Sequence, residues 1–199
     1  MAGKLYIVAT PIGNLEDMTL RAIGTLGSVG LIACEDTRHS GRLLKRHGMS
    51  AKLVSYHDHN KEQAAGRIVA KLLDGEDVAL VTDSGTPGVS DPAYLLVNLA
   101  RSEGVEVIPI PGPCAAIAAL SVSGLPSDRF SFEGFLPVKT GKRKTRLEGL
   151  KDDPRTLIFY ESPHRLLKTL TFIHEVLGNR NCVIARELTK LHEEIIRGN

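Results

Sequence analysis

The chain has 199 residues, of which 42% are hydrophobic, with 25 Lys and Arg against 23 Asp and Glu. This composition excludes a mainly disordered chain, and no apolar run approaches the roughly 20 residues that a membrane span needs. The three cysteines are odd in number and widely spaced, which argues for a reducing compartment and against a disulfide or zinc framework. Since the N-terminal apolar stretch is too short for a secretion signal, we expect a cytoplasmic protein.

The first half of the chain alternates short apolar runs with amphipathic segments. The runs predict strands at 5–9, 31–34, 52–55, 78–81 and 105–110, and the amphipathic segments predict helices at 19–26, 61–74 and 92–103. Asn60 is the expected N-cap of the helix at 61–74, with Gln63 three residues later and Gly75 after its end. Asp91 and Pro92 mark the start of the next helix. Strands that alternate with crossover helices predict a parallel α/β sheet.

Three prolines within residues 109–113 interrupt this alternation, because proline fits neither a strand ladder nor a helix interior. We therefore place a domain boundary there, with a first α/β domain at 1–110 and a second at 111–199. In the second domain the pattern predicts helices at 114–120, 140–150 and 162–178, and strands at 130–135, 156–160 and 182–187.

Each candidate ligand loop follows a predicted strand, where open α/β sheets bind their ligands. The loop at 10–14 lacks the G-x-G-x-x-G fingerprint of dinucleotide sites, and the stretch around Gly141 and Lys142 lacks the spacing of a triphosphate-binding loop. The loop at 82–92 has two glycines and two prolines between a buried strand and a capped helix. Such a loop can hold a small polar cofactor by main-chain hydrogen bonds; the alternative is a tight turn in which Asp91 only caps the helix.

Two polar clusters follow the second and third predicted strands. Glu35 and Asp36 can supply a general base, or one of them can pair with Arg38 and order the loop. His57 and His59 flank Asp58, but one short triplet without a distant partner does not indicate a metal site.

Two basic clusters contain no acidic residue. The first comprises Arg38, Arg42, Lys45, Arg46 and Lys52, and the second comprises Lys139, Lys142, Arg143, Lys144 and Arg146. Without these ten, the chain has 15 basic against 23 acidic residues, so the clusters can give a local positive field for a phosphate backbone. The alternative is two solvated helix or loop faces.

Seven segments, in order along the chain, are similar to those of one known family. They are TPIGNL at 10–15, ACEDTR at 33–38, DSGTPGVSDP at 83–92, PGP at 111–113, FEGFLP at 132–137, FYESPHR at 159–165, and ARELTK at 185–190 followed by His192, Glu193 and Glu194. Together they resemble the small-subunit ribosomal RNA cytidine 2′-O-methyltransferases of bacteria, a branch of the tetrapyrrole methylase superfamily.

The resemblance implies two α/β domains, the first with a mostly parallel sheet and the second with a mixed sheet, and S-adenosylmethionine in the cleft between them. It implies methyl transfer to the ribose 2′-hydroxyl of a cytidine in 16S ribosomal RNA, with the small ribosomal subunit RNA as partner. A homodimer without metal or membrane is also implied. Since the family usually continues past residue 199, we expect the second domain to lack a C-terminal segment.

The resemblance also implies which residues act. Carried over position by position, the cofactor-binding residues are Pro11, Asp83, Ser84, Gly85, Pro87, Val89, Cys114, Ala115, Tyr160 and Glu161. Many relatives carry Ala at position 84 and Ser at position 114, so only main-chain roles are implied there. A sulfonium already activates its methyl group, so the protein must align the 2′-oxygen with it and help to remove the hydroxyl proton. We expect Glu35 or Asp58 as the base and Arg38 as a clamp on an RNA phosphate or ribose.

The expected RNA is single-stranded or splayed, because a ribose within a packed duplex could not enter a narrow cleft. One alternative keeps the cofactor and methylates a tetrapyrrole carbon, against which the basic clusters and the segments at 159–165 and 185–190 argue. Another is an RNA-binding module without activity. With 5% aromatic residues and no RNP-like motif, a base-stacking platform of that kind is poorly supported.

Overall fold

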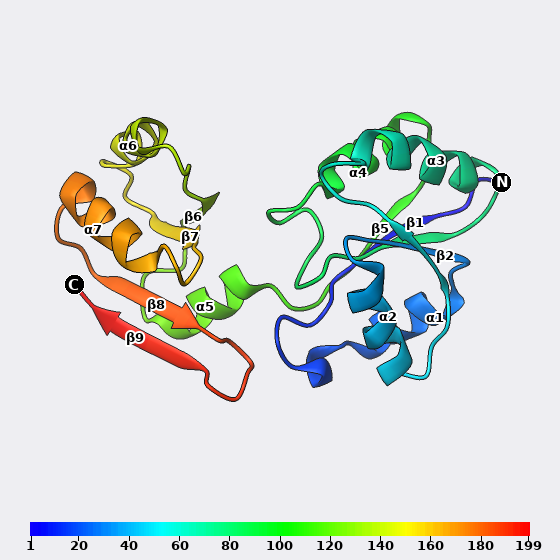
Figure 1. Cartoon of the computed structure of the whole chain (residues 1–199), viewed down its shortest axis with the longest axis horizontal. Helices are drawn as coiled ribbons and strands as arrows, with labels where there is room; N and C mark the ends of the chain where they lie inside the picture. Colours follow the sequence, from blue (N-terminus) through cyan, green and yellow to red (C-terminus); the bar gives the residue numbers. More distant parts are fainter. The chain divides into compact units, whose positions relative to one another are not determined.

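The computed structural model describes residues 1–199, which form two compact units, Met1–Cys114 and Ala115–Asn199 (Figure 1). The domain boundary expected after residue 110 falls within four residues of this division. That the two units are separate folding domains stays a prediction. None of the helices combines the length and the hydropathy that crossing a bilayer requires.

The first unit contains a five-stranded sheet in which all neighbouring strands run parallel, as the sequence predicts. Its order is β3-β2-β4-β1-β5, with β1 at Leu5–Val8, β2 at Leu31–Cys34, β3 at Lys52–Ser55, β4 at Val78–Leu80 and β5 at Val107–Ile110. Its helices are α1 at Leu20–Ser28, α2 at Thr37–Arg46, α3 at Lys61–Leu73 and α4 at Ala93–Ser102, with a short 3-10 helix, η1, at Leu15–Asp17. Leu5 of β1 lies beside Val78 on one side and Val107 on the other.

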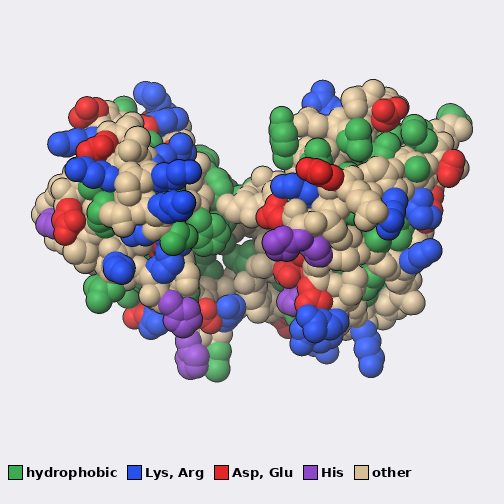
Figure 2. All heavy atoms as spheres, turned by 45° about the horizontal axis from the view of Figure 1, so that its top comes forward, with side chains coloured by type: hydrophobic (Ala, Val, Ile, Leu, Met, Phe, Trp, Pro, Cys, Tyr) green, Lys and Arg blue, Asp and Glu red, His purple; other side chains and the backbone are tan.

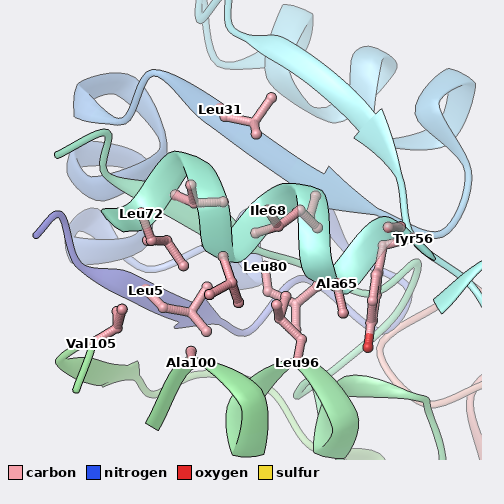
Figure 3. Close-up of a cluster of buried hydrophobic side chains, with 14 of the residues drawn as sticks. Leu5, Leu31, Tyr56, Ala65, Ile68, Leu72, Leu80, Leu96, Ala100 and Val105 are labelled. Carbon is pink, nitrogen blue, oxygen red and sulfur yellow. The ribbon is translucent and has the colours of Figure 1, made fainter. Parts of the chain in front are cut away.

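The two faces of this sheet belong to separate hydrophobic cores, because successive residues of a strand point to opposite faces. Leu5 and Leu31 lie in the core covered by α3 and α4, together with Ile68 and Leu96, as Figure 3 shows. Ile32, the next residue of β2, lies in the other core, with side chains of α1 and α2. In Figure 1 these two pairs of helices cover opposite faces of the sheet.

Helix α2 is absent from the prediction, which treats this segment as a polar loop and a basic cluster. Only Ser40, Leu43 and Leu44 of its ten residues are buried, so it shows too little apolar periodicity to predict a helix. The Asp36 side chain accepts a hydrogen bond from the Arg38 amide at its N-terminus, which is the usual role of an N-cap aspartate.

The two expected helix caps differ in outcome. Asn60 precedes α3 but makes no side-chain cap; its amide instead joins the His57 N–H to the Ser55 carbonyl and so closes the turn after β3. Its capping prediction is therefore wrong. Asp91, by contrast, accepts hydrogen bonds from the amides of Gly88 and Ala93, so its carboxylate holds the loop after β4 as well as the start of α4.

The second unit contains both parallel and antiparallel pairing, but in two separate two-stranded sheets rather than in one mixed sheet. Its elements are α5 at Ala115–Ser123, β6 at Phe130–Phe135, α6 at Thr140–Glu148, β7 at Thr156–Tyr160, α7 at Leu166–Leu177, β8 at Cys182–Arg186 and β9 at Glu194–Gly198. β6 and β7 are parallel, and β8 and β9 are antiparallel.

Two elements of this unit depart from the prediction. Helix α7 begins at Leu166 rather than near Ser162, because the Ser162 carbonyl closes a turn with the Arg165 amide. Strand β9 is absent from the prediction; it is mostly exposed and is defined by its pairing with β8 rather than by an apolar run. The small core of the unit consists of Leu136, Leu147 and Leu177 with partly buried side chains around them.

Candidate functional site

The loops that follow the five parallel strands lie together at the carboxyl edge of the first unit's sheet. Predicted site residues occur in all of them: Pro11 after β1, Glu35 and Arg38 after β2, Asp58 after β3, Asp83, Ser84, Gly85, Pro87 and Val89 after β4, and Cys114 after β5. The remaining three, Ala115, Tyr160 and Glu161, belong to the second unit.

Hydrogen bonds join the loop after β1 to the loop after β4. Thr10 and Gly85 exchange two backbone hydrogen bonds, with N···O distances of 2.9 and 3.1 Å. The Thr10 hydroxyl also donates to the Thr82 carbonyl at 3.1 Å. Gly85 has a φ of +90°, which residues with a side chain rarely adopt, and a Cβ there would lie 3.4 Å from the Ile12 Cγ2. The glycine therefore lets the two loops meet.

The loop after β5 contacts the same pair of loops. The Thr86 hydroxyl donates to the Pro113 carbonyl at 2.9 Å. A Cβ on Gly112 would lie 2.9 Å from the Cβ of Ala9. Only glycine at position 112 therefore lets the Pro-Gly-Pro turn lie this close to the end of β1. Three chain segments from distant parts of the sequence thus form one braced surface at the sheet edge.

This surface offers main-chain groups to a ligand. The amides of Ser84 and Thr86 donate no hydrogen bond within the chain, and Ser84 is exposed. Pro11 and Pro87 are buried, so their rings fix the loop path rather than present a surface. The arrangement fits a small polar cofactor held by backbone N–H and C=O groups, as the loop composition predicts.

Polar side chains link the ends of β2 and β4. The Thr82 hydroxyl donates to Glu35 Oε1, and the Asp36 amide donates to Asp83 Oδ1 at 3.2 Å. A cavity beside Glu35 is lined also by Thr82, Pro87 and Asp91. Its volume of about 10 Å³ is space for about one water molecule. Glu35 forms no ion pair, so its second carboxylate oxygen remains able to accept a proton or a hydrogen bond.

Arg38 is paired with Asp36, which is the alternative that the sequence left open. Its Nε and Nη2 donate to the two carboxylate oxygens of Asp36 at 3.1 and 2.8 Å. The Arg38 guanidinium therefore holds the pKa of Asp36 well below its usual range. Since the Arg38 side chain is 87% exposed, one edge of the guanidinium stays open to solvent, and its role as an RNA clamp stays a prediction.

Asp58 lies in the turn after β3 and is 70% exposed. The Lys61 ammonium is 2.9 Å from its Oδ1 and lowers the pKa of Asp58. Asp58 is thus a charged, ion-paired carboxylate at the protein surface, whereas Glu35 is half-buried and bonded to a hydroxyl. Of the two candidate bases, the surroundings favour Glu35.

In the second unit, the end of β7 contacts the start of α5. The Tyr160 hydroxyl accepts a hydrogen bond from the Ala116 amide at 3.2 Å, next to the predicted Ala115, and the Tyr160 ring packs edge-on against Phe132 and Phe135. This aromatic cluster fixes the ring at the carboxyl end of the strand.

Glu161 has a structural set of partners. Its two carboxylate oxygens accept from the Ser162 amide at 2.7 Å and from the Thr169 hydroxyl at 2.6 Å, and Arg165 lies 3.5 Å away. With 8% of its side chain exposed, Glu161 anchors the turn before α7 to that helix. A contact between Glu161 and the cofactor stays a prediction.

Two of the five residues of the second basic cluster do not fit a phosphate-binding patch, which is one of the two interpretations that the sequence allows. Arg143 is buried: its guanidinium donates to the carbonyls of Pro137 and Val138 and lies 5.5 Å from the centre of the Phe172 ring. Arg146 pairs with Glu133. Figure 2 shows Lys and Arg side chains gathered on the second unit, but Arg143 holds the loop before α6 and is not available to RNA.

The first basic cluster, by contrast, forms an exposed face of α2. Arg42, Lys45 and Arg46 are exposed, lie at helical spacing from Arg38 and form no ion pair. Lys45 and Arg46 occupy the last turn, where cations also interact favourably with the helix dipole. A row of unpaired cations of this kind suits a phosphate backbone.

Sequence reasoning missed four residues of this region: the three threonines Thr10, Thr82 and Thr86, which tie the loops together, and the exposed Tyr94 at the start of α4. The threonines lie in the segments that carry the family resemblance, which was a usable signal. Tyr94 had no such signal, because only the fold shows that this residue is 76% exposed beside these loops.

Comparison with solved structures defines the class of fold. Uroporphyrin-III-C-methyltransferase from Thermus thermophilus is similar with a TM-score of 0.69 at 22% identity, over 98% of this chain and 84% of that one. Diphthine synthase is similar with a TM-score of 0.75 at 14% identity, over 98% of this chain and 81% of that one. The chain has the two-unit α/β fold of these proteins.

Sequence comparison defines the family. Residues 4–199 match the family model of the Tetrapyrrole (Corrin/Porphyrin) Methylases. The ribosomal RNA small subunit methyltransferase I of Escherichia coli O157:H7 is 57% identical over 97% of this chain and 68% of its own length. The protein of that name from Pseudomonas aeruginosa is 53% identical over 98% of this chain and 69% of its own.

The chain therefore belongs to the tetrapyrrole methylase family, in the branch of the proteins named ribosomal RNA small subunit methyltransferase I. It is a methyltransferase that uses S-adenosylmethionine. The loop surface at the sheet edge, with its open main-chain amides, fits a polar cofactor of this kind.

Proposed function

We propose that this protein methylates the ribose 2′-hydroxyl of a cytidine in small-subunit ribosomal RNA. The observation that carries the proposal is the 57% identity to a ribosomal RNA small subunit methyltransferase I, which extends over 97% of this chain. The unpaired cations of α2 agree with a polyanionic partner such as RNA.

In this proposal the loops of the first unit hold the cofactor. Main-chain groups of the segment 83–89 would hold the cofactor, and the further residues expected to contact it are Pro11, Cys114, Ala115, Tyr160 and Glu161. S-adenosylmethionine supplies a methyl group that its sulfonium has already activated. The rigid Thr10–Gly85 pairing then preorganises the site, so that binding does not require the loops to be ordered first.

The protein's own task is to place the 2′-hydroxyl and to take its proton. Glu35 is the proposed base, because the Thr82 hydroxyl orients one carboxylate oxygen and leaves the other to accept the proton. Asp58 is the second candidate, although the pairing with Lys61 stabilises its charged form and makes it a weaker base. Arg38 would bind a phosphate or ribose with the exposed edge of its guanidinium.

The finer features expected from the sequence belong to the same proposal. The enzyme acts as a homodimer in the cytoplasm, on single-stranded or splayed RNA of the small ribosomal subunit. Phosphates on either side of the target bind α2, and no metal takes part.

A labelling assay tests the proposal. The protein is incubated with methyl-labelled S-adenosylmethionine and either small ribosomal subunits that lack the modification or a precorrin. Label at the 2′-oxygen of a cytidine is the expected result; label in the precorrin, or a failure to bind the cofactor in calorimetry, would refute it.

The base assignment is tested in the same assay. Glu35→Gln removes the proton acceptor and keeps the hydrogen bond with Thr82, so kcat should fall by about 10²- to 10⁴-fold while cofactor affinity stays within about two-fold. The matched control is Glu62→Gln, an exposed carboxylate in the first turn of α3, which should leave kcat unchanged. If Glu35→Gln retains full kcat, Glu35 is not the base.

A further inference from the structure

A groove of about 300 Å³ lies on the first unit, next to the proposed base. It is lined by Asp58, Lys61, Ser90, Asp91, Pro92, Tyr94 and Leu95. Its volume is at the lower end of the range of small-molecule sites. Because Asp91 and Pro92 also line the small cavity beside Glu35, the groove adjoins the proposed base across this one segment.

Hydrogen bonds hold the floor of the groove. Asp91 is fixed by the amides of Gly88 and Ala93, at 2.8 to 2.9 Å, and the Pro92 carbonyl accepts a hydrogen bond from the buried Tyr56 hydroxyl at 2.9 Å. Ser90 has a φ of +66°, in the left-handed region that residues with a side chain rarely adopt. Strain of this kind persists where the surrounding contacts impose it, and it is concentrated at binding sites.

The walls offer an aromatic ring and a pair of opposite charges. Tyr94 is 76% exposed, has no hydrogen-bond partner and presents its ring beside the groove. Opposite charges come from Asp58, a pure acceptor, and Lys61, a pure donor, whose side chains are 70% and 37% exposed; Lys61 pairs with Asp58 Oδ1 at 2.9 Å, which leaves Asp58 Oδ2 free to accept. An exposed aromatic ring with one acceptor and one donor nearby is the set of groups that recognises an unstacked base.

We propose that this groove holds the base of the cytidine whose ribose is methylated, with Tyr94 stacked on the ring and Asp58 accepting a hydrogen bond from its exocyclic amino group. This inference rests on the proposed function. A carboxylate is complementary to the N4 amino group of cytosine, whereas it faces the O4 carbonyl of uracil with like polarity. Lys61 donates to the O2 carbonyl or to the adjoining phosphate. The groove thereby selects cytidine over uridine.

The role of Asp58 is tested by exchanging the base. Small ribosomal subunits with cytidine or uridine at the modified position are methylated by the wild type and by Asp58→Asn. The amide of Asn can turn its NH₂ group towards O4 of uracil, so the C-to-U preference in kcat/KM should fall by about ten-fold or more. The control is Asp74→Asn at the far end of α3, which is exposed and unpaired and should leave the preference unchanged.

The role of Tyr94 is tested on the cytidine substrate. Tyr94→Ala should raise KM by about 5- to 100-fold, because stacking of one base on an aromatic ring contributes on that scale, while Tyr94→Phe should keep the wild-type KM. The control is Asn98→Ala, one turn further along the exposed face of α4. Cofactor affinity, measured by calorimetry, should be the same in all these variants.

Failure of this inference is distinct from failure of the proposed function. If the wild type does not methylate ribosomal RNA at all, the proposed function is wrong. If it does, but Tyr94→Ala behaves like Asn98→Ala and Asp58→Asn keeps the C-to-U preference, the groove does not hold the base. If Asp58→Asn loses activity equally on both substrates with cofactor affinity intact, Asp58 acts as the base and does not read the nucleotide.

Discussion

Arg38 is both a structural residue, through its pairing with Asp36, and a candidate for RNA contact. Asp36 caps α2 through the Arg38 amide and binds the Arg38 guanidinium with both oxygens. Any RNA contact by Arg38 therefore competes with Asp36, or uses only the exposed edge of the guanidinium. The carboxylate also sets the direction in which that edge points, so Asp36 is a positioning residue for α2 and for Arg38 alike.

The pKa of Asp36 gives a direct test of this pairing. Arg38 lowers the pKa of Asp36. The pair therefore stabilises the N-terminus of α2 fully at pH values above the ordinary pKa of Asp, and this contribution is lost as the pH falls through the lowered pKa. Arg38→Gln should raise the pKa of Asp36 towards its usual value, as measured by NMR titration of the carboxyl carbon.

A second pair in the chain provides the control for that measurement. Arg155 binds Asp153 in the same way, through Nε and Nη2, and lowers the pKa of Asp153 to about 2. Arg38→Gln should leave the pKa of Asp153 unchanged. An unchanged pKa of Asp36 would instead mean that Arg38 does not contact it in solution.

At the level of helices and strands, Gly24 and Gly112 have opposite effects on stability. Gly24 lies within α1 with nothing near its missing Cβ, so it only lowers helix propensity. Gly112 lies where a Cβ would meet the Cβ of Ala9 at 2.9 Å. Gly24→Ala should raise the free energy of unfolding by about 1 kcal/mol, read from urea denaturation followed by circular dichroism.

Gly112→Ala should have the opposite effect, because the Pro-Gly-Pro turn must then move away from β1. We expect it to lower the free energy of unfolding by about 1 to 3 kcal/mol and to weaken cofactor binding, since the Thr86 hydroxyl bonds to the Pro113 carbonyl in the same turn. If Gly112→Ala is as stable as the wild type, the close approach of these loops is not maintained in solution.

Which elements could be predicted follows from how each is stabilised. The strands β2 and β4 are fully buried and apolar, so their apolar runs mark them, and parallel order follows from the helices between the strands. Helix α2 has only two buried leucines, and β9 depends on its partner strand, so neither has an adequate local signal. The loops at the carboxyl edge were predictable as well, because each of them directly follows a predicted strand.

The contacts within the site were less predictable, because they join segments far apart in the sequence. The Thr10–Gly85 pairing, the bond from Thr82 to Glu35 and the burial of Arg143 all depend on tertiary packing. Arg143 lies within a run of basic residues, so its charge indicated a surface patch. Its guanidinium has five donors, however, and these suit it to bind the carbonyls of a buried turn.

For the whole molecule, the distribution of charge decides where RNA can bind. The net charge of +2 conceals a basic face on α2, where three exposed cations have no acidic partner. In the second basic cluster, by contrast, Arg143 is buried, both Lys144 and Arg146 lie near glutamates, and only Lys139 and Lys142 are exposed without an acidic partner. Since counterions are released where phosphates bind unpaired cations, most of the electrostatic affinity should come from α2.

Neutralising this face tests that distribution. Replacing Arg42, Lys45 and Arg46 together by Gln removes three unpaired cations without touching the loops at the sheet edge. If all three bind phosphates of single-stranded RNA, the slope of log K against log salt should become shallower by about 2. Calorimetry should show unchanged affinity for S-adenosylmethionine, because none of the three lies in the loops proposed to hold it.

The matched control uses cations on the opposite face of the same sheet. Arg67 on α3 and Arg101 on α4 are also exposed and form no ion pair, so their replacement by Gln removes charge of the same kind elsewhere. The salt slope should then stay as in the wild type. If both sets of substitutions change it equally, RNA responds to the total charge and α2 is not a specific contact. If neither does, the phosphates bind elsewhere, and the row of cations on α2 serves only to complement its helix dipole.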